Sequence, residues 1–294
     1  MKFTSFASKI TPKGQEAKIC TQNNLDSMLL KGKKGIIFGA LNEQSIAWKV
    51  AQQAKAAGAD IVLTNAPIAF RMGQIDELAK ELDCQAIPAD ATKLEDLEAL
   101  VEKSQEILGG KIDFVLHSIG MSVNIRKKKA YTDLKYDWMQ KTFDISAISF
   151  HKLMQTLWQK DAMAEWGSIL ALSYIGAQRV FPHYSEMSES KALLESFARS
   201  FGYHFGVRNK VRVNTISQSP TPTTAGTGVK GFDQFLDYAD KMSPLGNAPA
   251  EACADYCLSL FSDHTRYVTL QNLYHDGGFS NMGMSEIMMG EEPQ

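Results

Sequence analysis

The most restrictive feature of this sequence is a regular alternation of short apolar runs with longer segments of helical periodicity. The apolar runs occupy 34–39, 59–64, 84–90, 111–120, 167–173, 210–217 and 268–278. The helical segments lie between them, at 45–58, 72–83, 93–107, 134–160, 184–206 and 253–262. Strands that alternate with helices of this length predict a parallel sheet with helices on both faces. Right-handed crossovers then give a doubly wound α/β fold of about seven strands.

The domain organisation is predicted from how composition and periodicity change along the chain. No internal repeat, linker or low-complexity block interrupts 29–294, so this range is expected to form a single domain. Residues 1–28 are polar and lack clear periodicity. We interpret them as an N-terminal extension, either flexible or the product of an upstream start, and assign them no function.

Charge and composition narrow the functional class. The formal charge of −2 and the 22% of charged residues argue against a nucleic-acid partner. No apolar run is long enough to span a bilayer, and the amino terminus lacks the apolar stretch of a secretory signal. The cysteines lack paired C-x-x-C spacing, so we expect no metal site, reduced thiols and a cytoplasmic location. They are Cys20, Cys84, Cys253 and Cys257.

The loop after the first strand is a candidate phosphate-binding site, because ligands of such sheets bind at the carboxyl ends of the strands. Gly39 would let the backbone approach a pyrophosphate, and a helix that starts near Ser45 and Ile46 would offer free N–H groups. The loop is not a G-x-G-x-x-G motif. Taken alone, it fits an ordinary strand–helix turn equally well.

The next two strand ends offer fewer signals. Asn65 and Ala66 follow the second strand, where an acidic residue would favour NAD and an Arg would favour NADP. The choice therefore stays open, and Arg71 is interpreted as a solvated charge at a helix start. After the third strand, Asp90 is a candidate acceptor for an adenine amino group or a turn cap.

The fourth strand ends in His117 and three small or apolar residues, 118–120, that would let a dinucleotide lie flat on the sheet edge. His117 has two interpretations, a general base or a packed strand residue, and the second is favoured.

The strongest cluster of reactive side chains follows the fifth strand. Tyr184 and Lys191 are seven residues apart, nearly two helical turns, which predicts that both lie on one face of a helix. The ammonium group would favour the phenolate and so lower the pKa of Tyr184. Tyr174 leaves the fifth strand directly and should point into the same cleft. The alternative is that both tyrosines are packing residues.

Together these motifs resemble the NADH-type enoyl-acyl-carrier-protein reductases of the short-chain dehydrogenase/reductase superfamily. That family carries Tyr-x6-Lys with a second Tyr ten residues upstream, and a stretched first loop Gly-x5-Ser-Ile-Ala, which matches 39–47 here. The segments 117–120, 211–217 and 276–278 match as well, and the resemblance covers roughly 30–282. The superfamily's more common Tyr-x3-Lys is absent, because Met187 stands four residues before Lys191.

The chain departs from the family pattern in three places. The segment 217–220 reads Ser-Gln-Ser-Pro where the family commonly has Ser-Ala-Gly-Pro. Ala66 stands where the family often has Gln or a basic residue, which puts the adenosine contacts in doubt. Residues 1–28 have no counterpart.

The resemblance implies a Rossmann-type reductase that converts trans-2-enoyl-acyl-carrier protein to acyl-carrier protein, the last step of bacterial fatty-acid elongation. Hydride would come from NADH, with NADPH not excluded. Tyr184 would donate to the thioester oxygen, Lys191 would hold the nicotinamide ribose, and Tyr174 would shape the acyl pocket. Two alternatives remain: a short-chain dehydrogenase/reductase for a ketone or alcohol, which would need Tyr at 187, and a non-catalytic dinucleotide-binding protein.

The resemblance also assigns contacts residue by residue. The expected catalytic residues are Tyr174, Tyr184 and Lys191. The expected cofactor contacts are Gly39, Ser45, Ile46, Ala66, Asp90, Ala91, Ser118, Ile119, Gly120, Lys191, Thr221, Pro222, Thr223, Thr224 and Ala225. The expected substrate contacts are Met121, Ser122, Tyr174 and Tyr184.

The implied partners are an acyl carrier protein that bears the enoyl thioester and further copies of the chain in a homotetramer. The basic run 126–129 would dock an acidic carrier protein, unless it is a solvated loop. Phe232, Phe235 and Tyr238 are expected to divide between an acyl channel and the core. The last strand and tail, 268–284, are expected in a subunit contact.

Overall fold

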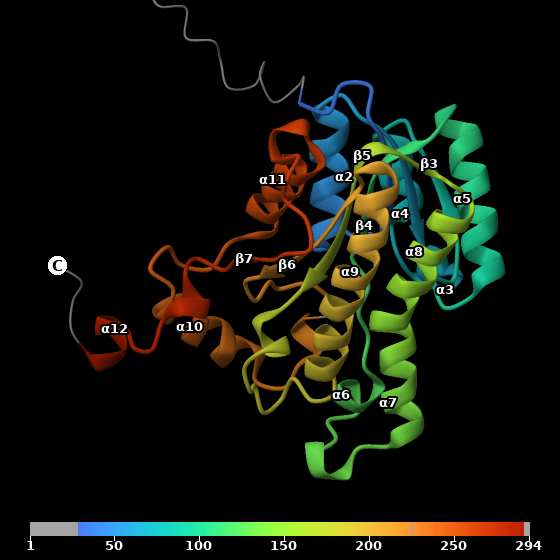
Figure 1. Cartoon of the computed structure of the whole chain (residues 1–294). Helices are drawn as coiled ribbons and strands as arrows, with labels where there is room; N and C mark the ends of the chain where they lie inside the picture. The colour runs from blue at the N-terminus through green and yellow to red at the C-terminus, as the bar shows by residue number, and fades with distance from the viewer. Residues whose placement is uncertain (1–28, 225, 291–294) are drawn as a thin grey trace, which may run out of the picture.

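A computed structural model describes residues 29–224 and 226–290 of the chain. Its centre is one parallel seven-stranded sheet in the order β3-β2-β1-β4-β5-β6-β7 (Figure 1). The strands are β1 (Lys34–Phe38), β2 (Asp60–Asn65), β3 (Gln85–Pro88), β4 (Ile112–His117), β5 (Met163–Ser173), β6 (Arg212–Gln218) and β7 (Asn272–His275). The predicted doubly wound fold is confirmed. The interpretations of 1–28 and of Ala225 lie outside the described residues.

Helices cover both faces of this sheet. The α-helices are α2 (Ile46–Ala56), α3 (Pro67–Met72), α4 (Ile75–Glu81), α5 (Leu94–Leu108), α6 (Val123–Arg126), α7 (Tyr136–Phe143), α8 (Ser149–Gln159), α9 (Met187–Asn209), α10 (Phe232–Met242), α11 (Ala250–Phe261) and α12 (Glu286–Met289). Short single turns are η1 (Tyr131–Asp133), η3 (Ile175–Ala177), η4 (Gly226–Gly228), η5 (Asp263–Thr265) and η6 (Phe279–Asn281).

Two separate apolar cores result from the pleat of the strands. Ile37 of β1 packs in the core with α2 and α11, whereas its neighbour Ile36 packs in the core with α5, α8 and α9. Consecutive side chains point to opposite faces of a strand, so a strand covered on both sides must be apolar throughout. This is why the predicted strands read as continuous apolar runs.

The helix predicted at 72–83 is present as the shorter α4, but the helix before it, α3, was not predicted, and the two are separated at Gly73. A Cβ added at Gly73 would come within 2.6 Å of the Leu41 side chain and carbonyl oxygen. The N–H group of Gln74 donates to that same Leu41 oxygen at 2.9 Å. The break therefore brings this connection against the loop that follows β1.

The long helix predicted at 134–160 is also not uniform. Between α7 and α8 the chain forms a π-helical segment, η2 (Asp144–Ile148). The Ser146 hydroxyl in this segment accepts from the N–H group of Met121 at 3.0 Å and donates to its carbonyl at 3.2 Å. Such π-helical insertions frequently occur at functional sites, and this one holds the loop after β4.

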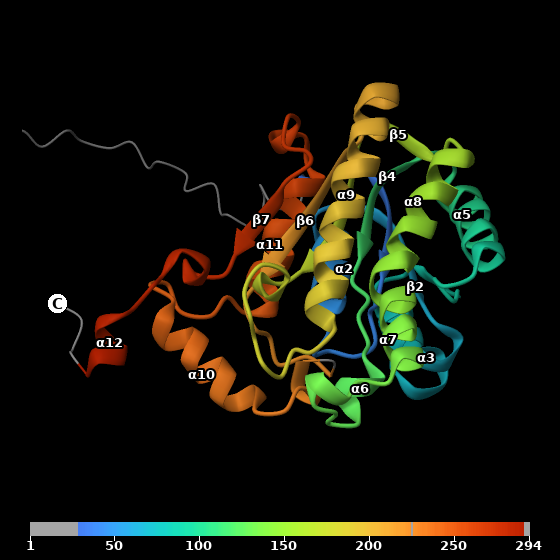
Figure 2. The same ribbon diagram turned by 60° about the horizontal axis from the view of Figure 1, so that its bottom comes forward.

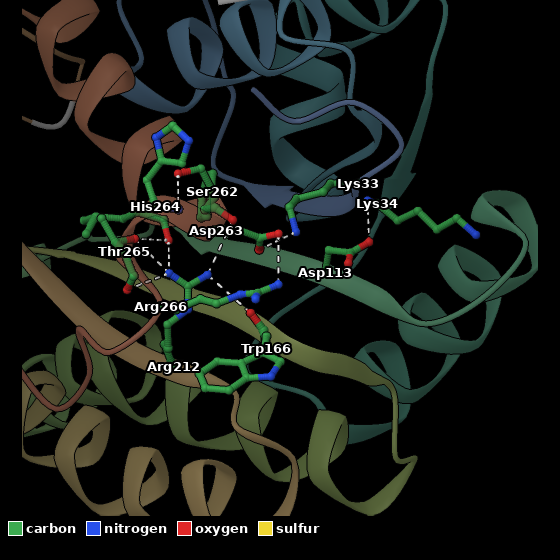
Figure 3. A network of polar contacts seen from close by, with 12 residues as sticks. Lys33, Lys34, Asp113, Trp166, Arg212, Ser262, Asp263, His264, Thr265 and Arg266 are labelled. Atoms are coloured by element: carbon green, nitrogen blue, oxygen red, sulfur yellow. Dashed lines mark hydrogen bonds and ion pairs between the residues drawn. The ribbon is translucent and has the colours of Figure 1, made fainter. Parts of the chain in front are cut away.

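A polar network holds α11 to the amino-terminal ends of the strands, away from the candidate site (Figure 3). Arg212, at the start of β6, is only 2% exposed and donates to the carbonyl of Leu260 and to Thr265. These are groups at and just beyond the carboxyl end of α11, where a positive charge is favourable. Beside it, Asp263 forms ion pairs with Lys33 and Arg266.

Three further findings concern residues 29–224 and 226–290: membrane-spanning helices, metal-ligating groups and cysteines. None of the helices there has the length and apolar character needed to cross a membrane. No group of His, Cys, Asp and Glu side chains in these ranges could hold a metal ion. Cys84, Cys253 and Cys257 are free thiols, and the last two are buried on α11. Cys20 lies outside the described residues.

Candidate functional site

The loops after β1 and β4 lie in direct contact at Gly39. Its φ is +100°, and a Cβ added there would be 2.0 Å from the carbonyl oxygen of Ser118. Only glycine permits both the positive φ and this close approach. The two loops expected to hold the pyrophosphate and the nicotinamide half of a dinucleotide are therefore neighbours.

Ser45 occupies the N-cap position of α2, but its side chain does not cap the helix. Its hydroxyl instead accepts from the N–H groups of Leu41 and Asn42, both at 3.2 Å. The stretched loop is thus folded back on Ser45. The first turn of α2, which begins at Ile46, therefore has no side-chain cap, which suits an anionic ligand.

The ends of β2 and β3 use their polar side chains locally. The Asn65 side chain accepts from the N–H group of Ala66 at 2.8 Å. Asp90 accepts from the N–H and hydroxyl groups of Thr92 at 3.0 and 2.7 Å, which is the turn-cap role. Ala91 beside it is buried. Arg71 is exposed as expected, but it lies in the last turn of α3, so its assignment to a helix start was wrong.

His117 is a packed residue, as favoured from the sequence. Its side chain is 1% exposed, its ring contacts those of Phe38 and Phe150, and its Nε2 atom lies 2.8 Å from the Ser149 hydroxyl. Burial, with a smaller effect of Lys191, lowers the pKa of His117 to about 3. A neutral, enclosed imidazole of this kind is a poor general base near neutral pH.

Lys191 lies between the ends of β4 and β5. Its Nζ atom donates to the carbonyl of Leu172 at 2.7 Å, and a Cβ added at Gly120 would be 3.9 Å from it. Burial lowers the pKa of Lys191 to about 8, against the opposing effect of Glu195. The Glu195 carboxylate accepts from the Ser173 hydroxyl at 2.6 Å, so this acid is itself tied to the end of β5.

Tyr174 and Tyr184 are in ring contact, with centroids 5.0 Å apart and planes inclined at 65°. They enclose Gly176, where an added Cβ would lie 2.9 and 2.8 Å from the two rings. The structure thus brings together the two tyrosines that the sequence indicated. The Tyr174 hydroxyl is buried and has no hydrogen-bond partner in the described part of the chain.

The helical argument that linked Tyr184 to Lys191 is wrong. The helix α9 begins at Met187, and Tyr184 lies in the turn before it, where Ser185 has a φ of +51°. Tertiary contacts across Gly176, rather than helical periodicity, set the position of Tyr184. No spacing rule signals a left-handed Ser at this point.

The expected direction of the pKa shift of Tyr184 is also wrong. Burial raises the pKa of Tyr184, and burial together with Tyr184 raises the pKa of Tyr174. Desolvation disfavours the phenolate, and it is the cause of the shift of Tyr184. Both tyrosines are therefore protonated hydrogen-bond donors at neutral pH.

The substrate-side residues after β4 are held mainly by other side chains. Met121 is half-buried, with its main chain bound by Ser146. The Ser122 hydroxyl donates to the buried carboxylate of Glu186 at 2.7 Å and caps α6 at the N–H group of Ile125. This occupies the Ser122 hydroxyl, which sequence reasoning had placed toward substrate. Glu186 itself was missed, because an acid at a helix start reads as solvent-exposed.

The threonine-rich loop after β6 reaches back to the first loop. The Asn42 side chain donates to the Thr224 hydroxyl at 3.0 Å. Thr221 donates to the carbonyl of Ser219, and Thr223 accepts from the N–H group of Gly226. The loop therefore has its own internal hydrogen bonds and is bonded to the loop that follows β1.

An aromatic hollow of about 420 Å³ lies beside Tyr174. Phe181 and Phe235 line it and contact each other and Tyr174. Of the stripe on α10, Phe232 is buried in the core while Phe235 and Tyr238 line the hollow, and the use of this hollow as an acyl channel stays a prediction.

A doubly wound sheet with a buried lysine and paired phenols at the carboxyl end of β5 has the architecture of a short-chain dehydrogenase/reductase. A family model described as enoyl-(acyl carrier protein) reductase matches residues 39–280. Enoyl-[acyl-carrier-protein] reductase [NADH] 1 of Rhizobium meliloti is 35% identical over 263 residues, 89% of this chain and 95% of its own length. The chain therefore belongs to the enoyl-(acyl carrier protein) reductase family.

Solved structures agree with this assignment. The crystal structure of a FabI–NADH complex from Alistipes finegoldii has a TM-score of 0.89 and 62% identity, over 90% of this chain and 94% of that one. The enoyl-acyl carrier protein reductase of Bacillus cereus, solved with NADP+ and indole naphthyridinone, has a TM-score of 0.81 and 32% identity. There the match covers 87% of this chain and 99% of that one.

Proposed function

We propose that the protein reduces trans-2-enoyl thioesters on acyl carrier protein to saturated acyl thioesters with NADH, as the last step of bacterial fatty-acid elongation. The observation that carries this proposal is the ring contact of Tyr174 and Tyr184 at the end of β5, where Lys191 is also anchored. Membership of the enoyl-(acyl carrier protein) reductase family supports the substrate class. When bound, the nicotinamide supplies the hydride.

Tyr184 is the proposed hydrogen-bond donor to the thioester oxygen, where negative charge develops as the β-carbon is reduced. Its raised pKa keeps the phenol protonated, which is the form that can donate. Tyr174 is proposed to shape the acyl pocket and to assist proton transfer. Its buried, unpartnered hydroxyl supports a role toward a ligand.

The residues present fit a bound dinucleotide. The close approach at Gly39 and the uncapped first turn of α2 suit a pyrophosphate. Lys191 is proposed to hold the ribose hydroxyls, since its ammonium retains two donors beyond the bond to Leu172. The other proposed contacts that the structure describes, from Ala66 and Asp90 to 221–224, follow the carboxyl ends of strands of the same sheet.

NADH is the proposed cofactor, although β2 ends in Asn65 and Ala66 without the acidic residue that commonly selects it. The Rhizobium meliloti relative is named for NADH, and the Alistipes finegoldii structure contains it. The Bacillus cereus structure contains NADP+. A comparison of both cofactors on this protein is therefore the direct test.

A ketone- or alcohol-directed reductase is less well supported. It would need Tyr four residues before Lys191, and that position holds the buried Met187. Nothing else in the described site supplies a phenol there. The non-catalytic alternative is opposed by the presence of both tyrosines and the lysine.

Steady-state reduction of crotonyl thioester with NADH and NADPH in parallel tests the proposal, with a ketone panel as control. We expect turnover on the enoyl thioester and none on the ketones. Turnover on a ketone alone, or on no substrate, would refute the proposed reaction.

The carrier protein is proposed to dock at the basic run 126–129. Arg126, Lys127 and Lys128 are exposed, whereas Lys129 is paired with Asp133. Figure 2 shows α6 and α10 beyond the same end of the strands. The helix α10 carries an acidic surface formed by Asp233, Asp237 and Asp240. An acidic partner would be attracted to α6 and repelled from α10.

Charge reversal of 126–128 tests this docking. It should raise KM for a carrier-bound substrate while KM for the neutral N-acetylcysteamine thioester stays unchanged. An equal effect on both substrates, or on neither, would contradict the docking site.

The domain 29–294 is proposed to act as a homotetramer in the cytoplasm. The short edge strand β7 and the exposed side chains of Tyr203, Val207 and Tyr267 offer surfaces for subunit contacts. The expected contact through 268–284 belongs to this proposal. Light scattering coupled to size-exclusion chromatography should give four times the chain mass, and a monomer would refute it.

A further inference from the structure

Glu186 is a fully buried acid that the proposed chemistry does not use. It directly precedes α9, its side chain is 0% exposed, and it forms no ion pair within the described ranges. Buried acids are rare unless their charge is compensated. We therefore looked for the groups that stabilise the Glu186 carboxylate in place of an ion pair.

Three neutral side chains donate to one oxygen of this carboxylate. Its Oε1 atom accepts from the Ser122 hydroxyl at 2.7 Å, the Thr142 hydroxyl at 2.9 Å and the Asn124 amide at 3.1 Å. Burial alone would raise the pKa of Glu186, but hydrogen bonds from groups including Ser122 and Asn124 outweigh it and lower the pKa below its ordinary value. The positive end of α9 also favours the ionised form.

The donors belong to one excursion of the chain, residues 121–142, which we call the β4 excursion. Asn124 also exchanges hydrogen bonds with the main chain of Lys135, just before α7. Tyr131, in the middle of the excursion, donates to Glu189 in the first turn of α9. The start of α9 therefore anchors the beginning, middle and end of the β4 excursion.

The same segment presents Tyr184, two residues before Glu186. This turn includes the left-handed Ser185, so it is not part of a regular helix that would hold it rigid. The Glu186 carboxylate joins the turn of Tyr184 to Ser122. Ser122 follows Met121, a proposed substrate contact. A shift of either partner would change the distance between the phenol and the substrate-side wall.

We propose that Glu186 is a positioning residue: its buried carboxylate locks the β4 excursion onto the turn of Tyr184, and so holds the donor in register with bound substrate. This inference rests on the proposed function for its kinetic consequences. The anchoring itself does not depend on it.

The kinetic test compares wild type with Glu186→Ala and Glu186→Gln, using the N-acetylcysteamine enoyl thioester. Misplacement of a catalytic group by about 1 Å can cost roughly 100-fold, so Glu186→Ala should lower kcat by about 10- to 100-fold. The affinity for NADH, measured by nicotinamide fluorescence, should stay within about twofold of wild type, because Glu186 is not among the proposed cofactor contacts. Glu186→Gln keeps an acceptor oxygen and should have a kcat between the two.

A double-mutant cycle separates positioning from general stability. In the Tyr184→Phe background, Glu186→Ala should have little further effect on kcat, because its effect passes through Tyr184. A full, additive loss in that background would overturn the proposal, as would an unchanged kcat in the single variant. Glu102→Gln, on the exposed face of α5, is the matched control and should behave as wild type.

Limited trypsin digestion tests the anchoring without any assay of activity. The basic run 126–129 lies in the β4 excursion, so Glu186→Ala should be cut there faster than wild type or Glu102→Gln. An unchanged cleavage rate would overturn the anchoring. If wild type proved inactive on enoyl thioesters, the proposed function would fail, and this digestion would still decide the structural claim.

Should Glu186→Ala not fold, Ser122→Ala and Thr142→Val each remove one donor and leave the carboxylate in place. Each should lower kcat in the same direction by a smaller factor, again with unchanged NADH affinity. Folded variants with wild-type kcat and wild-type trypsin resistance would refute the role of Glu186.

Discussion

The Nζ atom of Lys191 donates a 2.7 Å hydrogen bond to the carbonyl oxygen of Leu172, at the end of β5. On its other side, Gly120 has no side chain, and a Cβ there would lie only 3.9 Å from Nζ. The amine is thus held at the end of β5 and lies beside the backbone of Gly120 in the loop after β4. Burial also lowers the pKa of Lys191 to about 8, close to neutral pH.

This pKa predicts a pH dependence of cofactor binding. If the ammonium form binds the ribose hydroxyls, as proposed, the affinity for NADH is fully present well below pH 8 and is lost as pH rises through that value. We expect the Kd for NADH, from fluorescence titration, to be flat up to about pH 7 and to rise up to tenfold per pH unit above pH 8. Lys191→Arg should remove this dependence, because Arg stays protonated. A flat profile in the wild-type protein would contradict the prediction.

Tyr184→Phe should abolish most of the turnover without loss of cofactor binding. Removal of a donor to a developing oxyanion typically lowers kcat by about 10²- to 10³-fold. The NADH affinity should change by less than about twofold, because the phenol is proposed to contact substrate alone. Stopped-flow measurement of NADH oxidation gives the first quantity and fluorescence titration the second. Wild-type kcat in the variant would assign the donor elsewhere, with Tyr174→Phe as the next variant to compare.

Gly39→Ala should be strongly destabilising. The added Cβ would lie 2.0 Å from the carbonyl oxygen of Ser118, and the φ of +100° is unfavourable for alanine. We expect a loss of more than about 3 kcal/mol in the free energy of unfolding, or failure to fold. Gly32→Ala is the matched control, since its φ is +74° but nothing lies within 4 Å, and it should cost about 1 kcal/mol. Equal losses in urea denaturation would show that the contact with Ser118 is unimportant.

Arg212→Leu should destabilise the fold and leave the active site intact. The substitution leaves the carbonyls of Leu260 and Phe261 without their buried donor, at a cost of about 2–4 kcal/mol. The exposed Arg266→Leu, which loses an ion pair to Asp263, should cost less than about 1 kcal/mol. Denaturation midpoints measure both effects. The kcat of the folded Arg212 variant should match wild type, because the network lies at the opposite end of the strands.

The sheet was predictable because its signal is local. A strand covered on both faces buries consecutive side chains, as Ile36 and Ile37 do, and so it stands out as an unbroken apolar run. The predicted helices failed where local patterns carried less information than tertiary contacts. Gly73 divides α3 from α4 because it packs against Leu41, and the π-helical segment holds Ser146 against Met121.

In the candidate site, too, some features were predictable from local sequence and others depended on tertiary contacts. Tyr174, Tyr184 and Lys191 were identifiable from their spacing within the family pattern, and the two tyrosines do meet. The reason first given for Tyr184 and Lys191, a shared helix face, was wrong, since α9 begins only at Met187. The direction of the pKa shift of Tyr184 was also wrong, because burial is a property of the folded chain and cannot be read from neighbours in sequence.

The order of apolar runs and the residues that end them determined the architecture, the edge at which ligands bind and the family. Only the tertiary structure decided which polar groups are buried and what satisfies them. Glu186 receives its donors from Ser122, Asn124 and Thr142, which are 64, 62 and 44 residues away in sequence. Such contacts form after the sheet has brought distant loops together, so no local pattern encodes them.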